Sequence, residues 1–194
     1  KHLEWEEAWS ITSRSVAYTN HTLLPEALER WGLALFGSLL PRHLELIYEI
    51  NRRFLQQLRL RYPGNDQILR RLSIIDEEGT KAVRMAHLAT VASHHVNGVA
   101  ALHSELVKTD LFPEFAALWP EKFTNVTNGV TPRRWVALAN PKLSALLDDT
   151  IGDGWVQDLD QLRQLEAYAD DSGFLERWGQ TKLAVKRQFS HYIH

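Results

Sequence analysis

The densest run of side chains able to hydrogen-bond a ligand lies over residues 123–135, Phe-Thr-Asn-Val-Thr-Asn-Gly-Val-Thr-Pro-Arg-Arg-Trp. Asn128 precedes Gly129, and an Asn-Gly pair favours a turn in which the glycine takes a positive φ. Thr131 stands before Pro132, so it can cap a helix whose first residue is proline. The stretch therefore predicts a strand, a tight turn and the start of a helix.

These residues offer chemistry suited to a hydroxylated or an anionic ligand. The amide of an asparagine has two donor hydrogens and one acceptor oxygen, which suits a pair of sugar hydroxyls. A helix start suits an anion, and Arg133, Arg134 and Trp135 add two cations and an indole. The alternative is a plain strand-turn-helix connection with a solvated arginine pair, and short polar motifs of this kind leave both interpretations open.

Other chemistries find less support in the residue patterns. Four histidines, at His87, His94, His95 and His103, invite a metal site. On a helix His87 and His94 would lie two turns apart, too far for one ion without other ligands, so packed or hydrogen-bonded histidines are favoured and no metal is predicted. The sequence contains no nucleophile elbow, phosphate-binding loop or dinucleotide fingerprint.

Composition narrows the class of protein. The chain has 194 residues, 44% hydrophobic and 24% charged, with a net charge of −2, which is an ordinary balance for a globular protein. A dedicated nucleic-acid binder would carry a basic excess. The chain has no cysteine, which excludes disulfides and thiolate metal sites, and no apolar run long enough to predict a membrane span. Both ends fall in helical patterns, so we expect a piece of a longer polypeptide.

The elements that must position these residues are mostly helices. The clearest one starts at Pro41, where Leu44, Ile47, Phe54 and Leu58 recur near the helical period, and stops at 62–65. The fold class predicted is mainly α with a few short strands. Further helices are predicted over 1–11, 25–31, 66–72, 85–93, 102–107, 111–118, 135–140, from 141, 159–168 and 174–194, and short strands over 73–76 and 81–84. Residues 96–100 are predicted to interrupt or bend a helix.

Longer motifs make the chain similar to the glycogen or α-glucan phosphorylase family. One is Tyr-Thr-Asn-His-Thr-Leu-Leu-Pro-Glu-Ala-Leu-Glu-Arg-Trp at 18–31, and another is Thr-Asn-Gly-Val-Thr-Pro-Arg-Arg-Trp at 127–135. Shorter ones lie at 40–44, 48–51, 85–88, 96–100 and 103–104. They occur in the family's order and spacing, and the resemblance covers nearly the whole chain, weakening in the tail.

The resemblance implies an enzyme that transfers a glucosyl unit from the non-reducing end of an α-1,4-glucan, glycogen or maltodextrin, to inorganic phosphate, giving glucose 1-phosphate. It implies pyridoxal 5'-phosphate as cofactor, a homodimeric parent enzyme and a cytoplasmic location, with neither nucleic acid nor membrane as partner. The family fold has two large α/β domains of the glycosyltransferase-B-like kind. Residues 1–194 would be a single piece, the later part of the N-terminal domain and its run-in to the second domain.

The resemblance also assigns site residues. His21 and Asn128 are the candidate catalytic residues, and with Val99 they line the glucosyl subsite. The backbone carbonyl of His21 would face the developing sugar cation, while its ring reaches the 6-hydroxyl. Trp135 matches an aromatic residue beside the cofactor, whose Schiff-base lysine matches no lysine of this chain and would lie outside it.

A separate glycogen-storage site of animal enzymes is matched only in part. Tyr48, Asn51, Glu77 and Lys81 match it, but Arg52 replaces an amide, which argues against that site in this chain. A different class of function is also compatible with the composition, namely a non-catalytic helical module that binds carbohydrate or another protein.

Overall fold

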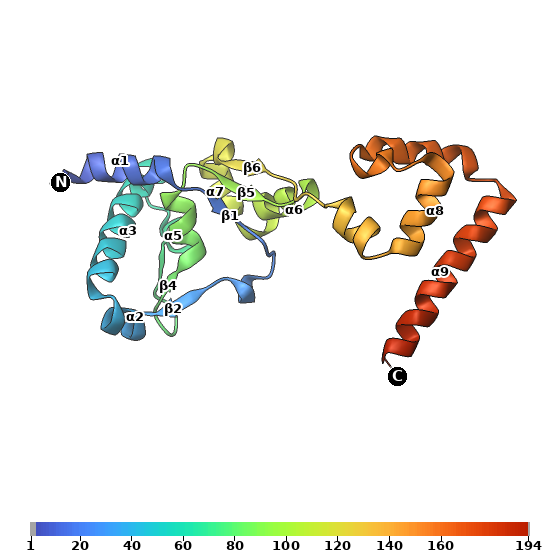
Figure 1. The fold of residues 1–194 in the computed structure, drawn as a ribbon. Coiled ribbons are helices and arrows are strands. Elements are labelled where there is room, and N and C mark those ends of the chain that lie inside the picture. The colour runs from blue at the N-terminus through green and yellow to red at the C-terminus, as the bar shows by residue number, and fades with distance from the viewer. Residues whose placement is uncertain (1–2, 194) are drawn as a thin grey trace. The chain divides into compact units, whose positions relative to one another are not determined.

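The computed structural model describes residues 3–193. These residues form two compact units, unit 1 ending at Asn128 and unit 2 starting at Gly129. Both are mainly helical, and unit 1 also holds two small sheets. Figure 1 labels the elements along the chain. Within the described part, no helix combines the length and the apolar character needed to cross a membrane.

The longest helix of unit 1 is α3 (Pro41–Arg61), and the sequence pattern predicted it. Proline stands at its first position, where a missing N–H costs no hydrogen bond. Its apolar face is buried through Ile47, Phe54 and Leu58. The helix ends where the chain turns at Gly64, whose φ of 75° a residue with a side chain would adopt only with strain.

Shorter helices make up the rest of the helical part of unit 1, and most of them add apolar residues to its core. They are α1 (Trp5–Ser15), α2 (Leu33–Leu39), α4 (Asp66–Leu72), α5 (Met85–Ala92), α6 (Ala101–Leu106) and α7 (Pro113–Leu118). One π-helix, η2 (Val107–Leu111), and two 3-10 helices, η1 (Pro25–Ala27) and η3 (Pro120–Lys122), link them.

Two three-stranded sheets bring distant parts of unit 1 together. In one sheet, β5 (Val96–Gly98) lies between β1 (Tyr18–Thr19) and β6 (Phe123–Asn125), and all strands run parallel. In the other, β4 (Ala82–Arg84) lies between β2 (Arg30–Gly32) and β3 (Ile75–Asp76), and both pairings are antiparallel. The parallel sheet is the one that concerns function, because its strands all end on the same edge.

The helix predicted over residues 25–31 is wrong. Pro25 opens only the 3-10 turn η1, and the chain then extends into β2, where Trp31 pairs with Val83. An ion pair of 2.5 Å between Arg30 and Asp76 also holds this strand to β3. Pairing with a partner far along the chain therefore overrides the local helix preference. Residues 96–98, predicted to interrupt or bend a helix, form the central strand β5.

The expected tight turn and helix cap over residues 128–135 are also wrong. Gly129 does not take a positive φ. The side chain of Thr131 caps nothing, and it is the Thr131 carbonyl that accepts hydrogen bonds, from the N–H groups of Arg134 at 3.1 Å and Trp135 at 3.0 Å. The helix that follows, η4 (Arg133–Leu138), is a π-helix.

Unit 2 is helical, as expected, and it packs around one tryptophan. Its elements after η4 are α8 (Pro141–Ile151), η5 (Gly154–Val156), η6 (Leu159–Tyr168) and α9 (Ser172–Ile193). Trp155 is fully buried with Leu146 and Leu147 of α8, and its indole N–H donates to the Asp148 carboxylate at 2.8 Å. A single large side chain thus anchors the small core of this unit.

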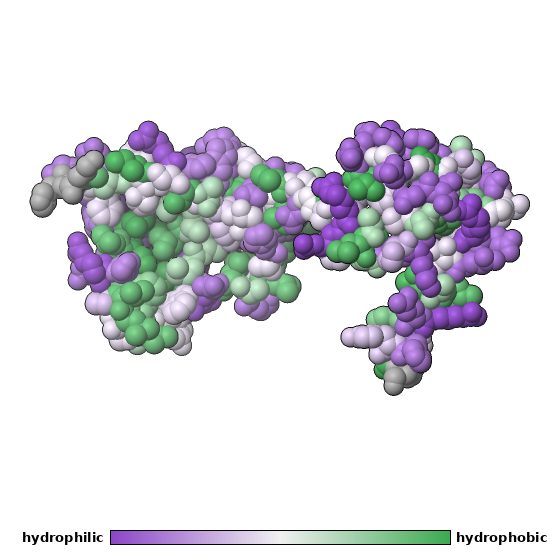
Figure 2. Space-filling model, in the orientation of Figure 1, coloured by the Kyte–Doolittle hydropathy of each residue, from purple (hydrophilic) through white to green (hydrophobic). Residues whose placement is uncertain are grey.

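Part of the apolar surface of unit 1 faces outward. Leu35 and Leu39 of α2, together with Leu40 and Leu46, are exposed, whereas Phe36 and Ile47 beside them are buried. Figure 2 shows this hydrophobic surface over α2. A contiguous exposed patch of leucines is typical of a surface that packs against another protein segment.

His87 is packed in the core and hydrogen-bonded, as the sequence favoured over a metal site. Its ring meets those of Phe112 and Phe115 edge-on, and its Nδ1 lies 3.1 Å from the Ser73 carbonyl oxygen. Burial, helped by the nearby charge of Arg84, lowers the pKa of His87 from 6.5 to about 4. The imidazole is therefore neutral in the folded protein at neutral pH.

Acid should destabilise unit 1 through this histidine. Because the pKa of His87 is lower in the folded state, the unfolded chain binds the extra proton, so stability is full above pH 6.5 and falls as the pH drops towards 4. At about 1.4 kcal/mol per pKa unit, the loss is roughly 3 kcal/mol at pH 4. Urea unfolding at pH 7 and pH 4 measures it, with His87→Asn as the control, because its amide can still donate to Ser73 but cannot titrate. Equal pH dependence in both proteins would contradict the assignment.

Candidate functional site

The carboxyl edge of the parallel sheet collects three of the residues singled out in the sequence. Asn20 and His21 follow β1 directly, Val99 follows β5, and Asn128 lies three residues after β6. The three strands lie side by side in the order β1, β5, β6, as Figure 1 shows. The structure therefore brings His21, Val99 and Asn128 to one edge of one sheet, although the sequence separates them widely.

Backbone hydrogen bonds hold the three loops together beyond the strands. The N–H of Asn20 donates to the Asn97 carbonyl at 2.9 Å, which continues the pairing of β1 with β5. On the other side, the N–H of Asn128 donates to the Val99 carbonyl at 2.9 Å. Asn128 is thus held by its own backbone against the loop of Val99, and this replaces the expected turn at Gly129 as the means of positioning it.

Two other asparagines beside this edge have side chains that are used inside the protein. Asn20 is only 1% exposed, and its side chain donates to the Tyr18 hydroxyl and accepts from the Thr22 N–H. The Asn97 side chain accepts from the Thr19 hydroxyl at 2.8 Å and donates to the Gly98 carbonyl. These amides shape the loops on either side of the edge.

His21 and Asn128 remain available for a ligand. Both are exposed, and within residues 3–193 neither side chain makes a hydrogen bond. The imidazole of His21 and the amide of Asn128 can both donate and accept, as sugar hydroxyls also can. An edge built from amides, an imidazole and backbone carbonyls therefore suits a ligand rich in hydroxyl groups better than a strongly charged one.

Trp135 belongs to unit 2. It lies in η4 and is 66% exposed, so one large aromatic surface is open to solvent. Arg133 of the same helix is partly engaged, because its guanidinium donates to the Val156 carbonyl at 3.0 Å.

The residues that match a storage site are not gathered into one pocket. Asn51 and Glu77 help to line a groove of about 530 Å³ in unit 1, whereas Tyr48 and Lys81 do not. The amide of Asn51 is used internally, since it donates to the Ser73 hydroxyl and accepts from the Ile74 N–H at 2.8 Å. It therefore serves the core of unit 1.

Arg52, the residue that departs from the storage-site pattern, is held by Glu49. Its guanidinium donates to both carboxylate oxygens of Glu49 at 2.7 Å, and Arg53 donates to the same carboxylate at 2.6 Å. Hydrogen bonds from Arg52 and Arg53 lower the pKa of Glu49 to about 2. The arginine is thereby engaged along its own helix.

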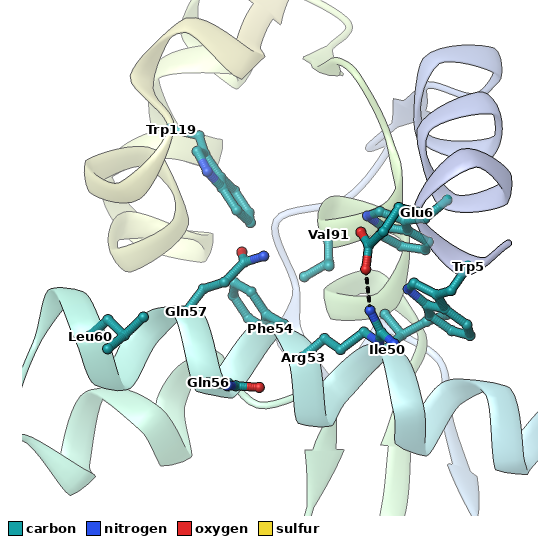
Figure 3. A pocket seen from close by; sticks show the side chains of 11 residues that line it. Trp5, Glu6, Ile50, Arg53, Phe54, Gln56, Gln57, Leu60, Val91 and Trp119 are labelled. Atoms are coloured by element: carbon teal, nitrogen blue, oxygen red, sulfur yellow. Dashed lines mark hydrogen bonds and ion pairs between the residues drawn. The ribbon is translucent and has the colours of Figure 1, made fainter.

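A cavity of about 320 Å³ is lined by residues of α1, α3 and α5 and by Trp119, and none of the predicted site residues lines it. Figure 3 shows Trp5 and Glu6 on one side of it and Trp119 on the other. The rings of Trp5 and Trp9 stack with 6.5 Å between centroids, and the guanidinium of Arg53 lies 4.6 Å from the Trp5 ring and pairs with Glu6. This arrangement braces α1 against α3.

The remaining histidines do not assemble a metal centre in the described part of the chain. Within residues 3–193, no group of three or more His, Cys, Asp or Glu residues is arranged to hold an ion. Helix α5 ends before His94, so the expected helical spacing from His87 does not exist. His94 and His95 are exposed, with their Nδ1 atoms 2.7 Å apart.

The sequence patterns assigned no role in the site to His103 or Ser104 of α6, although both contact the loops of the site. His103 accepts a hydrogen bond from the Val99 N–H at 3.0 Å, and Ser104 donates to the Asn125 side chain at 2.8 Å. The signal in the sequence was the spacing, because His103 follows Val99 by four residues across a helix start. The structure shows what this spacing achieves, because it places the His103 imidazole beside the Val99 N–H, at the end of strand β5.

Fold and site together define a class of protein. A polar cluster at the carboxyl edge of a parallel sheet is the usual place for a ligand in α/β proteins, and this cluster suits a carbohydrate. The chain belongs to the carbohydrate phosphorylase family, whose profile matches residues 1–194.

Individual proteins are similar in sequence to this chain over its whole length. It is 61% identical over 193 residues to the glycogen phosphorylase of Synechocystis, 54% identical over 194 residues to that of Chlamydia pneumoniae, and 49% identical over 193 residues to the muscle form of Bos taurus. In each case the whole of this chain is covered, but only 23–24% of the relative's length. The chain thus spans about a quarter of these relatives.

Proposed function

We propose that this chain is part of an α-1,4-glucan phosphorylase. The parent enzyme transfers a glucosyl unit from the non-reducing end of glycogen or maltodextrin to inorganic phosphate, giving glucose 1-phosphate. The observation that carries the proposal is the identity of 49–61% to proteins named glycogen phosphorylase across the whole chain. The neutral, hydroxyl-binding character of the site edge supports the same ligand class.

In this proposal, the carboxyl edge of the parallel sheet is the glucosyl subsite. The exposed amide of Asn128 hydrogen-bonds sugar hydroxyls, and the His21 ring reaches the 6-hydroxyl. The carbonyl of His21 faces the anomeric carbon, where its negative end stabilises the positive charge that develops as the glycosidic bond breaks. Val99 forms the wall between them, because its carbonyl holds the backbone of Asn128.

The chain would occupy the later part of the N-terminal domain and its run-in to the second domain of a glycosyltransferase-B-like fold. In the same proposal, the parent enzyme is a homodimer that acts in the cytoplasm, and its substrates are glucan and phosphate. Asn128 is the last residue of unit 1.

Pyridoxal 5'-phosphate, when bound, supplies a phosphate group that exchanges a proton with the substrate phosphate. The residues described here fit one contact with it, the exposed indole face of Trp135. The half-buried Lys122 is engaged by the Thr90 carbonyl at 2.9 Å and lies over the Trp119 ring. No lysine of this chain matches the cofactor lysine of the family, so in this proposal the anchoring lysine belongs to another part of the parent enzyme.

In the full-length enzyme, Asn128→Ala should lower kcat/KM more than it lowers stability. One neutral hydrogen bond to substrate is worth roughly 0.5–1.5 kcal/mol. If the contact strengthens as the ring flattens towards an oxocarbenium-like state, the loss is larger and appears in kcat as well as KM. The side chain makes no hydrogen bond within residues 3–193, so folding should change little. Phosphorolysis kinetics with maltodextrin measure the effect.

His21→Ala is the matched comparison, because its backbone carbonyl survives the change. It should lose mainly the ring's contact with the 6-hydroxyl, and the melting temperatures of both variants control for folding. Unchanged kinetics for Asn128→Ala, or a loss explained wholly by a lower melting temperature, would remove Asn128 from the site.

A further inference from the structure

His103 forms the first link in a chain of hydrogen bonds that ends at Asn128. Its Nδ1 accepts from the Val99 N–H at 3.0 Å, and the Val99 carbonyl accepts from the Asn128 N–H at 2.9 Å. The two bonds use both polar groups of one peptide residue, Val99. A change in the imidazole therefore acts on the placement of Asn128 without any direct contact between the two side chains.

Gly98 keeps the imidazole close enough for this bond. A Cβ at position 98 would lie 2.8 Å from the Nδ1 of His103 and 2.5 Å from the hydroxyl oxygen of Ser104, closer than side chains pack. Gly98 has no positive φ, so its backbone alone does not require glycine. The close approach of α6 to β5 is what requires it.

Ser104 secures the neighbouring loop from the same turn of α6. Its hydroxyl lies 2.8 Å from the Asn125 Oδ1 and 2.9 Å from the Ala100 carbonyl oxygen, and the Asn125 amide donates to the Thr127 hydroxyl at 3.0 Å. The loop between β6 and Asn128 is thus bound through side chains by Ser104 and through backbone by Val99. Two successive residues of one helix therefore hold two of the three strands that form the edge, β5 and β6.

The bond to Val99 assigns the tautomer of the His103 imidazole. An imidazole that accepts at Nδ1 carries its hydrogen at Nε2. The Nε2 atom is buried, and among residues 3–193 it has no hydrogen-bond partner. Burying an unpaired donor is unfavourable, so a histidine present only for packing would be better replaced by an apolar residue. The acceptor at Nδ1 is the property that distinguishes histidine here.

We propose that His103 is a positioning residue of the glucosyl subsite, holding Val99 and through it Asn128 against the sugar. The proposal rests on the function proposed above. His103 touches no substrate atom in this scheme. It acts by presenting one acceptor to one backbone N–H, which leaves the Val99 carbonyl oriented towards Asn128.

Two substitutions in the full-length phosphorylase test this role. His103→Leu keeps bulk and removes the acceptor, whereas His103→Asn offers its Oδ1 near the place of Nδ1. Small misplacements of a catalytic group can cost on the order of 100-fold in rate, so we expect the leucine variant to lose kcat/KM on that scale, with a fall in kcat. The asparagine variant should recover most of it. His43→Leu, at an exposed histidine on α3, is the control and should leave the kinetics unchanged.

Hydrogen exchange of the peptide segment that contains Val99 gives a readout independent of activity. In the leucine variant, the Val99 N–H should exchange at least about tenfold faster because it has lost its acceptor, and the asparagine variant should restore the protection. Unchanged exchange in His103→Leu would overturn the inference whatever the kinetics.

Faster exchange with unchanged kinetics would also overturn it, because the hydrogen bond would then exist without serving the reaction. The Asn128→Ala enzyme tells the two failures apart. If Asn128→Ala loses kcat/KM while His103→Leu does not, only the positioning role fails. If neither variant loses activity, the proposed subsite itself is wrong.

Discussion

Replacing Trp155 with alanine is expected to lower the free energy of unfolding of unit 2 by about 3–5 kcal/mol, the usual cost of removing a buried tryptophan. Trp155 is fully buried, and unit 2 has few other buried residues, among them Leu146 and Leu147. Little else can close the cavity left behind. Hydrogen exchange of the α8 amides reports the stability of this unit separately from that of unit 1, where α3 serves as the internal reference.

Two further variants show which property of Trp155 matters. Trp155→Phe keeps most of the packing but loses the hydrogen bond to Asp148, so its loss should be clearly smaller. Trp135→Ala removes the same side chain from an exposed position of unit 2 and should hardly change α8 exchange. Equal exchange rates for α8 in Trp155→Ala and the parent protein would show that Trp155 does not anchor the unit.

Gly98→Ala is expected to cost unit 1 roughly 1–3 kcal/mol and to disturb the candidate site at the same time. The added methyl would fall 2.8 Å from the backbone Cα of Ser104, which cannot swing away as a flexible side chain could. Strand β5 and helix α6 must then separate, which moves Val99. Urea unfolding measures the first effect, and kcat/KM of the full-length enzyme measures the second.

Gly32→Ala is the control for the same substitution elsewhere in unit 1. Among residues 3–193, no atom outside the glycine and its two chain neighbours lies within 4 Å of a Cβ at position 32, and its φ of −56° suits alanine. The change should be neutral or slightly stabilising, because alanine restricts the unfolded chain. Should both glycine variants unfold at the same urea concentration, close packing at position 98 would not be the reason for glycine there.

Local sequence signals predicted most of the helices but only three of the six described strands, β3, β4 and β6. Helix α3 has a long apolar period, a proline at its start and a Pro-Gly stop, so each local signal agrees with the fold. Strands β1, β2 and β5 have only two or three residues each. Such short strands carry no readable alternation, and their partners lie far along the chain, so single-sequence patterns could not find them.

The sequence features that pointed to the candidate site differ from the contacts that hold its residues in place. Motif resemblance selected His21, Val99 and Asn128, and the structure places all three on one sheet edge. The local interpretation of Asn128, a turn allowed by Gly129, was wrong, because a backbone bond to Val99 holds it instead. That bond depends on strand register, which neither composition nor spacing encodes.

The parallel sheet also constrains when the site can form during synthesis. Thr19 pairs with Asn97 across 78 residues, and β6 follows still later. Contacts of such long range form slowly, because the intervening chain must first be ordered. On a ribosome adding about 5–20 residues per second, β1 emerges seconds before its partner exists. The helices between them can fold in that interval, so the site edge is expected to be among the last parts of unit 1 to assemble on the nascent chain.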